Sequence, residues 1–167
     1  QLLADLAVHA LDLVLADVPV PPGLGVRAFA HLLGTSDATV FGTAEMAERW
    51  RAGFPRSLDG VPWLLQTPNT ALRRSLERWF VEAGVRPRVV AEVEDVAILQ
   101  ALGQGGMGVF AAPTVVEADI RRAYGVVAIG RLTTVRERFY AISVERKLRH
   151  PAVVAISEGA KEWSVEG

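Results

Sequence analysis

The sequence contains no cysteine, which excludes disulfide bonds, thiolate zinc sites and cysteine nucleophiles. Histidine is scarce as well: His9, His31 and His150 form no H-E-x-x-H motif and no pair at the spacing of helical metal ligands. None of the six serines lies in a G-x-S-x-G motif. The sequence therefore has no motif of a hydrolase or a metalloenzyme. We expect a protein that is not an enzyme and needs no cofactor.

Long hydrophobic runs and an excess of charge of one sign are also missing. No apolar run approaches the ~18 residues of a membrane-spanning helix, and no secretory signal is recognisable. With 18 basic and 19 acidic residues the formal net charge is -1, so the chain has no general attraction to phosphate backbones. These features predict a cytoplasmic protein that does not bind DNA by itself. The 167 residues, half of them hydrophobic, suffice for one globular domain or two small lobes.

Residues 66–113 have the clearest alternation of helix and strand signals. An amphipathic helix is predicted after Pro68 because apolar residues recur there at the helical period. The residues of this stripe are Leu72, Leu76, Trp79, Phe80 and Ala83. Asn69 or Thr70 is expected to cap the first turn of the helix, and Gly84 to take the left-handed conformation at its end. The helix is therefore predicted to have well-defined ends.

The alternation continues beyond this helix. Residues 88–93 are rich in β-branched side chains and predict a strand. A second helix is predicted to start at Glu94 or Asp95 and to run through Leu102, before an apolar strand at 109–112. Strands that alternate with helices in this way predict an α/β fold with parallel strands.

The glycine-rich stretch 103–108, GQGGMG, matches the G-x-G-x-x-G pattern of dinucleotide-binding proteins. Its context is wrong, because it follows a predicted helix and enters a strand, whereas the nucleotide motif leaves a strand and opens a helix. We interpret these glycines as a helix stop and a tight turn.

The remaining signals predict two α/β lobes. The expected elements are a helix at 1–10, a buried strand at 11–16, an extended run at 26–33, a strand at 38–43, a helix at 44–52, strands at 63–65 and 126–129, a helix at 114–124, a strand at 139–145 and a helix at 150–163. Polar stretches at 34–37 and 130–138 interrupt this pattern, and the first is a candidate hinge. Lobe I would comprise 1–34 plus 131–167 and lobe II 35–130, with a hinged cleft between them.

Ligands of open α/β sheets bind where strands end and helices begin. In this chain those positions are 66–70 and the pair Glu94 and Asp95, and Asp17 also follows a predicted strand. Each has a simpler explanation: Asp17 as a turn or cap residue, and the acidic pair as partners of a helix dipole. Arg73 and Glu77 are four residues apart, as are Arg78 and Glu82, and both pairs indicate ion pairs on a solvated helix face.

Four segments carry a family resemblance: LDLVLAD before a Pro/Gly turn, TPNTALRRSLERWF, PRVVAEVEDVAILQALGQGGMGVFAAP and RERFYAISVERKLRHPAVVAISE. In this order they resemble the effector-binding domain of LysR-type transcriptional regulators. The resemblance implies two Rossmann-like lobes of the type 2 periplasmic-binding-protein kind, with an effector in the cleft. It also implies a homodimer or homotetramer, and an N-terminal winged helix-turn-helix that contacts DNA and is absent from this N-terminally truncated chain. A solute-binding protein of a transporter would have the same lobes and is the alternative.

The resemblance also implies effector-binding positions at the loop and helix start 66–70, at the helix start 94–96 and at the strand end before Asp17. The residues with suitable side chains or positions there are Asp17, Thr67, Asn69, Thr70, Glu94, Asp95 and Val96. Their carboxylates and neutral oxygens favour a hard cation or a neutral polar molecule, whereas the helix N-termini favour an anion such as an organic acid.

The last three segments are most similar to regulators of sodium/proton antiport, which implies sodium or lithium as the effector. A cation would bind Asp17, Glu94 and Asp95.

Overall fold

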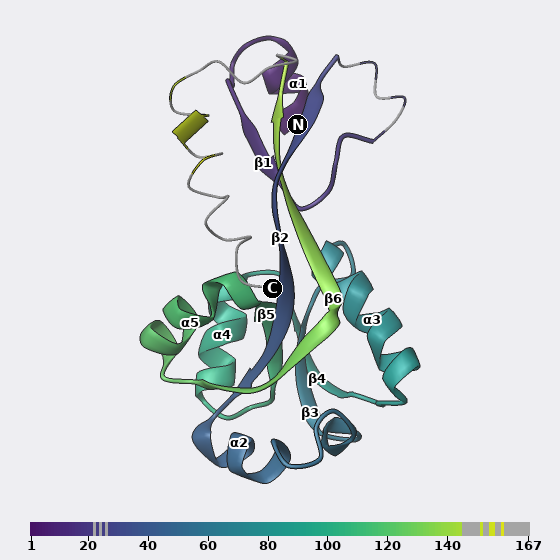
Figure 1. Ribbon diagram of the computed structural model, residues 1–167, viewed down its shortest axis with the longest axis vertical. Coiled ribbons are helices and arrows are strands. Elements are labelled where there is room, and N and C mark those ends of the chain that lie inside the picture. The colour runs from purple at the N-terminus through teal and green to yellow at the C-terminus, as the bar shows by residue number, and fades with distance from the viewer. Residues whose placement is uncertain are drawn as a thin grey trace. The chain divides into compact units, whose positions relative to one another are not determined.

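The computed structural model describes residues 1–21, 23, 25, 27–144, 151, 154, 155 and 158. The chain divides into two compact units, unit 1 with residues 1–36 and 138–167 and unit 2 with residues 37–137. Its elements in chain order (Figure 1) are α1 (Leu2–Ala7), β1 (Val14–Ala16), β2 (Phe29–Gly42), α2 (Ala44–Trp50), the short helix η1 (Arg56–Leu58), β3 (Pro62–Gln66), α3 (Ala71–Ala83), β4 (Arg88–Val93), α4 (Val96–Gln104), β5 (Phe110–Pro113), the short helix η2 (Thr114–Val116), α5 (Glu117–Tyr124) and β6 (Val127–Ser143). No helix in the described part of the chain is long and apolar enough to cross a membrane.

Unit 2 is built on a mixed sheet. Strands β3 and β4 are parallel, as predicted, and Trp63 of β3 forms a parallel bridge with Val109, just before β5. Strand β5 also pairs with β2, which lies outside the stretch 66–113, and this pair is antiparallel. Strand β2 crosses from unit 1 into unit 2, so its direction is not set by the local alternation of strands and helices.

Helices cover both faces of this sheet (Figure 1). On one face, α3 packs its apolar stripe against the buried side chains of Trp63 and Leu65. On the other face, Leu99 of α4 and Ile120 of α5 pack against Leu64. Consecutive residues of β3 thus alternate between two cores, because successive side chains of a strand point to opposite faces. Strand β3 is therefore a central strand of the unit, buried on both sides.

The helix ends follow from local sequence and confirm the predictions. The hydroxyl of Thr70 accepts a hydrogen bond from the amide of Arg73 and caps α3, and Gly84 ends that helix with φ 65°. Asp95, rather than Glu94, caps α4. Gly125 ends α5 in the left-handed conformation. Since a residue with a Cβ is strained at positive φ, glycine at 84 and 125 defines where each helix stops.

The glycine-rich stretch forms the turn from α4 into β5, as its sequence context predicts. Gly106 adopts φ 76°, and two other glycines permit close packing. A Cβ on Gly103 would lie 2.4 Å from the Phe110 ring, and a Cβ on Gly108 would lie 2.8 Å from the carbonyl oxygen of Pro62. These glycines therefore serve helix termination and packing.

Unit 1 contains α1, β1 and the adjoining parts of β2 and β6. Strand β1 pairs with β6 in the antiparallel direction, and Leu6, Val14 and Ile142 form a buried cluster. The strand predicted at 11–16 is shorter than expected and is not fully buried, because Leu15 is 58% exposed. Its one buried face matches an edge strand of an antiparallel sheet.

Two predicted interruptions are absent, because β2 and β6 are continuous strands through 34–37 and 130–138. The polar residues there alternate with buried ones. Leu132 and Val135 of β6 are buried, while an ion pair of 3.5 Å joins Arg136 of β6 to Asp37 of β2. Polar side chains on a strand's exposed face are compatible with its backbone ladder. Residue 145 and most of the helix predicted at 150–163 lie outside the described residues.

Candidate functional site

The predicted effector loops of unit 2 leave the sheet side by side. The last paired residues of the parallel strands β3 and β4 are Gln66 and Val93, so the loops 67–70 and 94–95 begin at the same edge. Helices α3 and α4 start directly after these loops. The predicted residues at this edge are Thr67, Asn69, Thr70, Glu94, Asp95 and Val96. Asp17 follows β1 in unit 1, and its part in a shared site stays a prediction.

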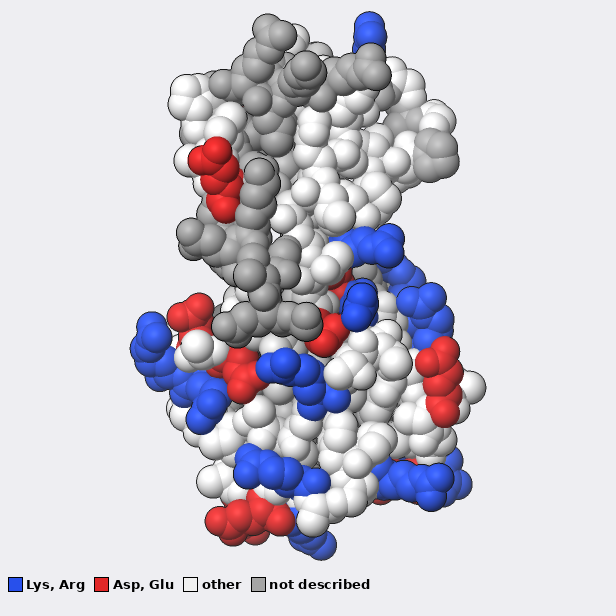
Figure 2. Space-filling view, in the orientation of Figure 1, with Lys and Arg blue, Asp and Glu red and all other residues white. Residues whose placement is uncertain are grey.

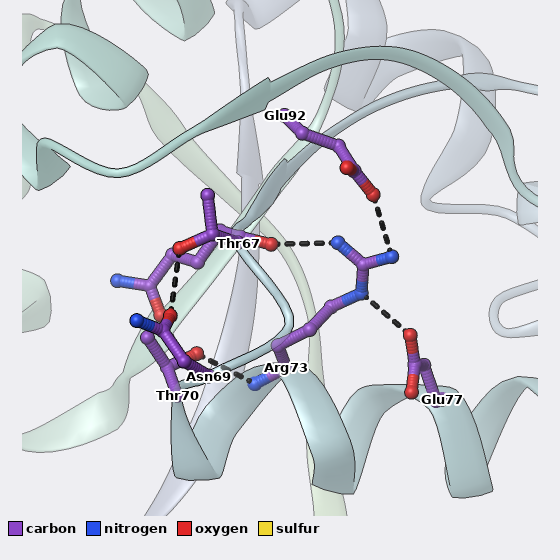
Figure 3. A network of polar contacts seen from close by, with 7 residues as sticks. Thr67, Asn69, Thr70, Arg73, Glu77 and Glu92 are labelled. Carbon is purple, nitrogen blue, oxygen red and sulfur yellow. Dashed lines mark hydrogen bonds and ion pairs between the residues drawn. The ribbon is translucent and has the colours of Figure 1, made fainter.

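The loop 67–70 is held by its own hydrogen bonds (Figure 3). The Thr67 hydroxyl donates to Oδ1 of Asn69 at 2.7 Å, and the amide of Thr70 donates to the Thr67 carbonyl at 3.4 Å. Arg74 donates to the Asn69 carbonyl at 3.0 Å. Asn69 is exposed, whereas Thr67 and Thr70 are half-buried. The loop therefore presents neutral oxygen atoms at the sheet edge in a defined conformation.

The two acidic residues of the second loop have different roles. Oδ1 of Asp95 accepts hydrogen bonds from the amides of Ala97 at 2.8 Å and Ile98 at 3.2 Å. Glu94 is exposed and makes no hydrogen bond or ion pair with any described residue. Asp95 is therefore committed to capping α4, as the simpler sequence explanation proposed, and Glu94 retains an open carboxylate.

Arg73 is the residue of this edge that sequence reasoning missed. Its side chain is 9% exposed, so the predicted solvated helix face is wrong at this position. Its guanidinium donates to the Gln66 carbonyl at 2.6 Å and to Glu77 Oε1 at 2.9 Å, and it forms an ion pair with Glu92 Oε1 at 2.7 Å (Figure 3). Three partners offset the cost of removing a charge from water.

A signal for this burial is present in the sequence. Arg73 lies three residues before Leu76 and seven before Phe80, which places it beside the buried stripe of α3. The ion pair with Glu77 was predicted and is confirmed. Of the described residues, Arg78 contacts the Ser75 hydroxyl and forms no ion pair with Glu82.

A β-bulge places Glu92 beside Arg73. The register runs from Trp63 paired with Val89 to Leu64 paired with Ala91, so one residue of β4 is extra. Glu92 therefore pairs with Leu65, whose side chain lies on the face covered by α3. In a regular ladder Ala91 would pair with Leu65, and Glu92 would face the opposite core. Bulges re-aim side chains in this way because they shift the two-residue alternation.

A second polar group lies at the end of β5. The hydroxyls of Thr39 and Thr114 are 2.9 Å apart, and the Thr39 hydroxyl donates to Glu117 at 3.4 Å. Because the chain entering β5 runs parallel to β3, these residues lie at the same edge of the sheet as the two loops. Thr39 is 1% exposed. No motif in the sequence marks this group, since its members come from β2, η2 and α5.

The charge balance at the loop edge is negative. In and next to the loops 67–70 and 94–95 lie two basic residues, Arg73 and Arg74, and four acidic ones, Glu77, Glu92, Glu94 and Asp95, which sum to a formal charge of -2. Among the described residues, no group of three or more histidine and acidic side chains is arranged to hold a metal ion. Over the face seen in Figure 2, basic and acidic side chains of unit 2 are interspersed. Carbonyl and hydroxyl oxygens would have to complete the coordination of any cation.

The opposite edge of the sheet carries an ion pair between Asp59 and Arg86, just before β3 and β4 begin. Side-chain and backbone hydrogen bonds from Arg86 lower the pKa of Asp59, and the same pairing raises the pKa of Arg86. This pair fastens the starts of the two strands, away from the loops.

Comparison with known proteins now decides the family. Residues 1–164 match the family described as LysR substrate binding domain. The chain belongs to this family. Its resemblance to LysR-type regulators is confirmed, as is the periplasmic-binding-protein-like fold. The regulators found by the comparison also argue against the transporter alternative.

Two curated relatives are named transcriptional activator protein NhaR, from Escherichia coli (strain K12) and Shigella flexneri. The chain is 31% identical to each over 156 residues, which are 93% of this chain and 51% of the relative. It therefore spans about half the length of these relatives.

Two solved structures share the fold. The regulatory domain of Synechocystis PCC6803 CcmR in complex with 2-PG has a TM-score of 0.68 at 13% identity, covering 99% of this chain and 79% of that one. The sulfate-bound regulatory domain of the OxyR2 E204G mutant from Vibrio vulnificus has a TM-score of 0.70 at 13% identity, covering 97% and 76%.

Proposed function

We propose that this chain is the effector-sensing and oligomerisation domain of a LysR-type transcriptional activator, and that the β3/β4 edge takes up the effector. Family membership and the likeness to NhaR support the first part. The second part is supported by the adjoining loops after Gln66 and Val93, which start two helices at one edge. Ligands of α/β sheets bind at such edges.

The effector that fits this edge best is a cation. The observation that carries this proposal is the commitment of the donor groups: Asp95 already occupies the first amides of α4, Thr70 accepts from an amide of α3, and Arg73 is surrounded by oxygens. An incoming carboxylate would have to displace these partners and would meet an excess of negative charge. The open group is the Glu94 carboxylate, and the neutral oxygens Thr67 Oγ1 and Asn69 Oδ1, which share one hydrogen bond, have further lone pairs to offer a cation.

A monovalent cation suits this set, because hard cations prefer oxygen ligands and few of the ligands here carry a full charge. The resemblance of three segments to regulators of sodium/proton antiport points to sodium or lithium. We therefore extend the proposal to control of sodium/proton antiport.

A small organic acid is the second candidate. Two solved structures of the same fold support an anionic effector, since one is a regulatory domain in complex with 2-PG and the other is sulfate-bound. In this chain such an acid would draw on Arg73 and Arg74, the basic residues of the edge.

Sodium and lithium are expected to raise the melting temperature of the chain more than potassium at equal ionic strength, and Glu94→Gln is expected to weaken that response severalfold. Glu94 is the cleanest position to change, because Asp95 and Thr70 cap helices and their loss would cost about 1 kcal/mol of stability each. Thermal shift and calorimetry measure the response. Glu82→Gln, on the exposed surface of α3, is the matched control.

Equal responses of the natural chain to all three salts would contradict the proposal that a sodium or lithium ion is the effector. A saturable response to an organic acid alone, abolished by Arg73→Ala, would favour the second candidate. These outcomes separate the two effector classes.

The whole regulator is proposed to be a cytoplasmic homodimer or homotetramer that contacts DNA through an N-terminal domain outside this chain. The net charge of -1 supports the assignment of DNA binding to another part of the protein. Paired DNA half-sites are read by symmetric oligomers. Light scattering of the full-length protein should give a dimer or tetramer, and a monomer at high concentration would contradict this proposal.

A further inference from the structure

The guanidinium of Arg73 lies among oxygens of the kind that hold hard cations. These are the main-chain carbonyl of Gln66 and the carboxylates of Glu77 and Glu92, at 2.6, 2.9 and 2.7 Å from its nitrogens (Figure 3). Carboxylates and carbonyls are the usual ligands of calcium. Arg73 thus acts as an internal cation that already fills this group of oxygens.

The β-bulge in β4 brings Glu92 into this group. Glu92 reaches Arg73 because the register shift between Trp63 and Leu64 turns it toward the face covered by α3. Its carboxylate is 46% exposed, so a solvent ion could reach it once the guanidinium is removed. Without the bulge, the regular ladder would direct the Glu92 carboxylate to the opposite face of the sheet, away from Arg73.

Arg73 also holds both ends of the loop 67–70. Its side chain binds the carbonyl of Gln66, just before the loop, and its amide donates to the hydroxyl of Thr70, at the end of the loop. Among the loop-edge carboxylates, Asp95 caps α4, and Glu77 and Glu92 are paired with Arg73, which leaves Glu94 as the open one. One open carboxylate with neutral oxygens suits a monovalent ion, and a second would favour a divalent ion.

We propose that Arg73 is a positioning residue that determines ion specificity: its guanidinium withholds Glu92 from the effector, so that the edge selects monovalent over divalent cations. This inference rests on the proposed sensing of sodium or lithium.

The test compares calcium and magnesium responses of the natural chain, Arg73→Gln, Arg73→Gln/Glu92→Gln and the control Arg78→Gln. Arg78 lies on the exposed side of the same helix. Arg73→Gln is expected to bind calcium on the order of tenfold more tightly than the control, and the added Glu92→Gln is expected to remove this gain. A merely structural role of Arg73 would lower stability without creating a calcium response that depends on Glu92.

No gain of calcium binding in folded Arg73→Gln, or a gain that survives Glu92→Gln, overturns the inference. If Arg73→Gln does not fold, Arg73→Met takes its place in the same comparison, because methionine keeps a long apolar side chain for packing and removes the charge. Glu92→Gln alone should leave the apparent sodium or lithium affinity within about twofold, since Glu92 is outside the ligand set. A larger loss of sodium or lithium affinity in Glu92→Gln also overturns the inference. If the natural chain does not respond to sodium or lithium, the proposed function is contradicted instead.

Discussion

Replacing Trp63 with alanine is expected to lower the free energy of unfolding by about 3–5 kcal/mol. Trp63 is fully buried in the central strand β3, and its ring meets that of Phe80 edge to face at a centroid distance of 4.9 Å. Alanine would leave a cavity between β3 and α3 that neighbours on a packed sheet cannot fill. Urea unfolding followed by circular dichroism measures the change.

Two variants make this prediction specific. Val81→Ala is the control, because Val81 is 82% exposed on α3 and its loss should stay within about 0.5 kcal/mol. Trp63→Phe removes the buried indole N–H, which has no hydrogen-bond partner among the described residues. Removing this unsatisfied donor offsets part of the stability that is lost with the smaller side chain, so the free energy of unfolding is expected to fall by less than about 2 kcal/mol. A decrease of less than about 1 kcal/mol in the free energy of unfolding for Trp63→Ala would contradict the tight packing of Trp63 between β3 and α3.

The elements that the sequence predicts well are those set by local contacts. Thr70 and Gly84 bound α3 because a cap hydroxyl and a left-handed glycine act on their own helix ends. The strand at 88–93 was predicted with its observed bounds. From these two elements and the parallel order of β3 and β4, the position of the two loops at one edge follows.

The failures all involve partners distant in sequence. The polar stretches at 34–37 and 130–138 resemble loops in the sequence, but they belong to the long strands β2 and β6, where Asp37 and Arg136 form an ion pair. A residue-by-residue pattern contains no information on that pairing. The antiparallel pairing of β2 with β5 likewise joins residues far apart in the sequence, and no local pattern predicts it.

The candidate site was likewise predictable in part. Thr67, Asn69 and Glu94 follow from the rule that loops after parallel strands meet. The burial of Arg73 does not, because it depends on Glu92, and Glu92 faces Arg73 through a bulge with no sequence signature. The polar group around Thr39 was missed because its members come from three separate elements. Non-local register is thus the information that the sequence pattern lacks.

Replacing Arg73 with alanine is expected to lower the free energy of unfolding by about 3 kcal/mol, at the lower end of the cost of breaking a buried ion pair. The value is at this end because Glu77 and Glu92 remain about half exposed and water can solvate them. The Gln66 carbonyl also loses its donor, and β3, β4 and α3 lose their common contact. Urea unfolding at constant ionic strength measures the loss, with Arg78→Ala on the exposed side of α3 as the control.

Double-mutant cycles show which partner carries the effect. Arg73 and Glu77 form a pair within one helix, for which a coupling of about 0.3–0.5 kcal/mol is usual. Arg73 and Glu92 join a helix to a strand at 2.7 Å, and removing either leaves the other without its partner at the sheet edge. We expect a coupling of about 1 kcal/mol for this second pair, at the upper end for exposed ion pairs, because Arg73 is buried although Glu92 is 46% exposed. Equal couplings for both pairs would mean that the bulge in β4 does not hold Glu92 against Arg73 in solution, and the selection of monovalent ions by this arginine would then lose its physical basis.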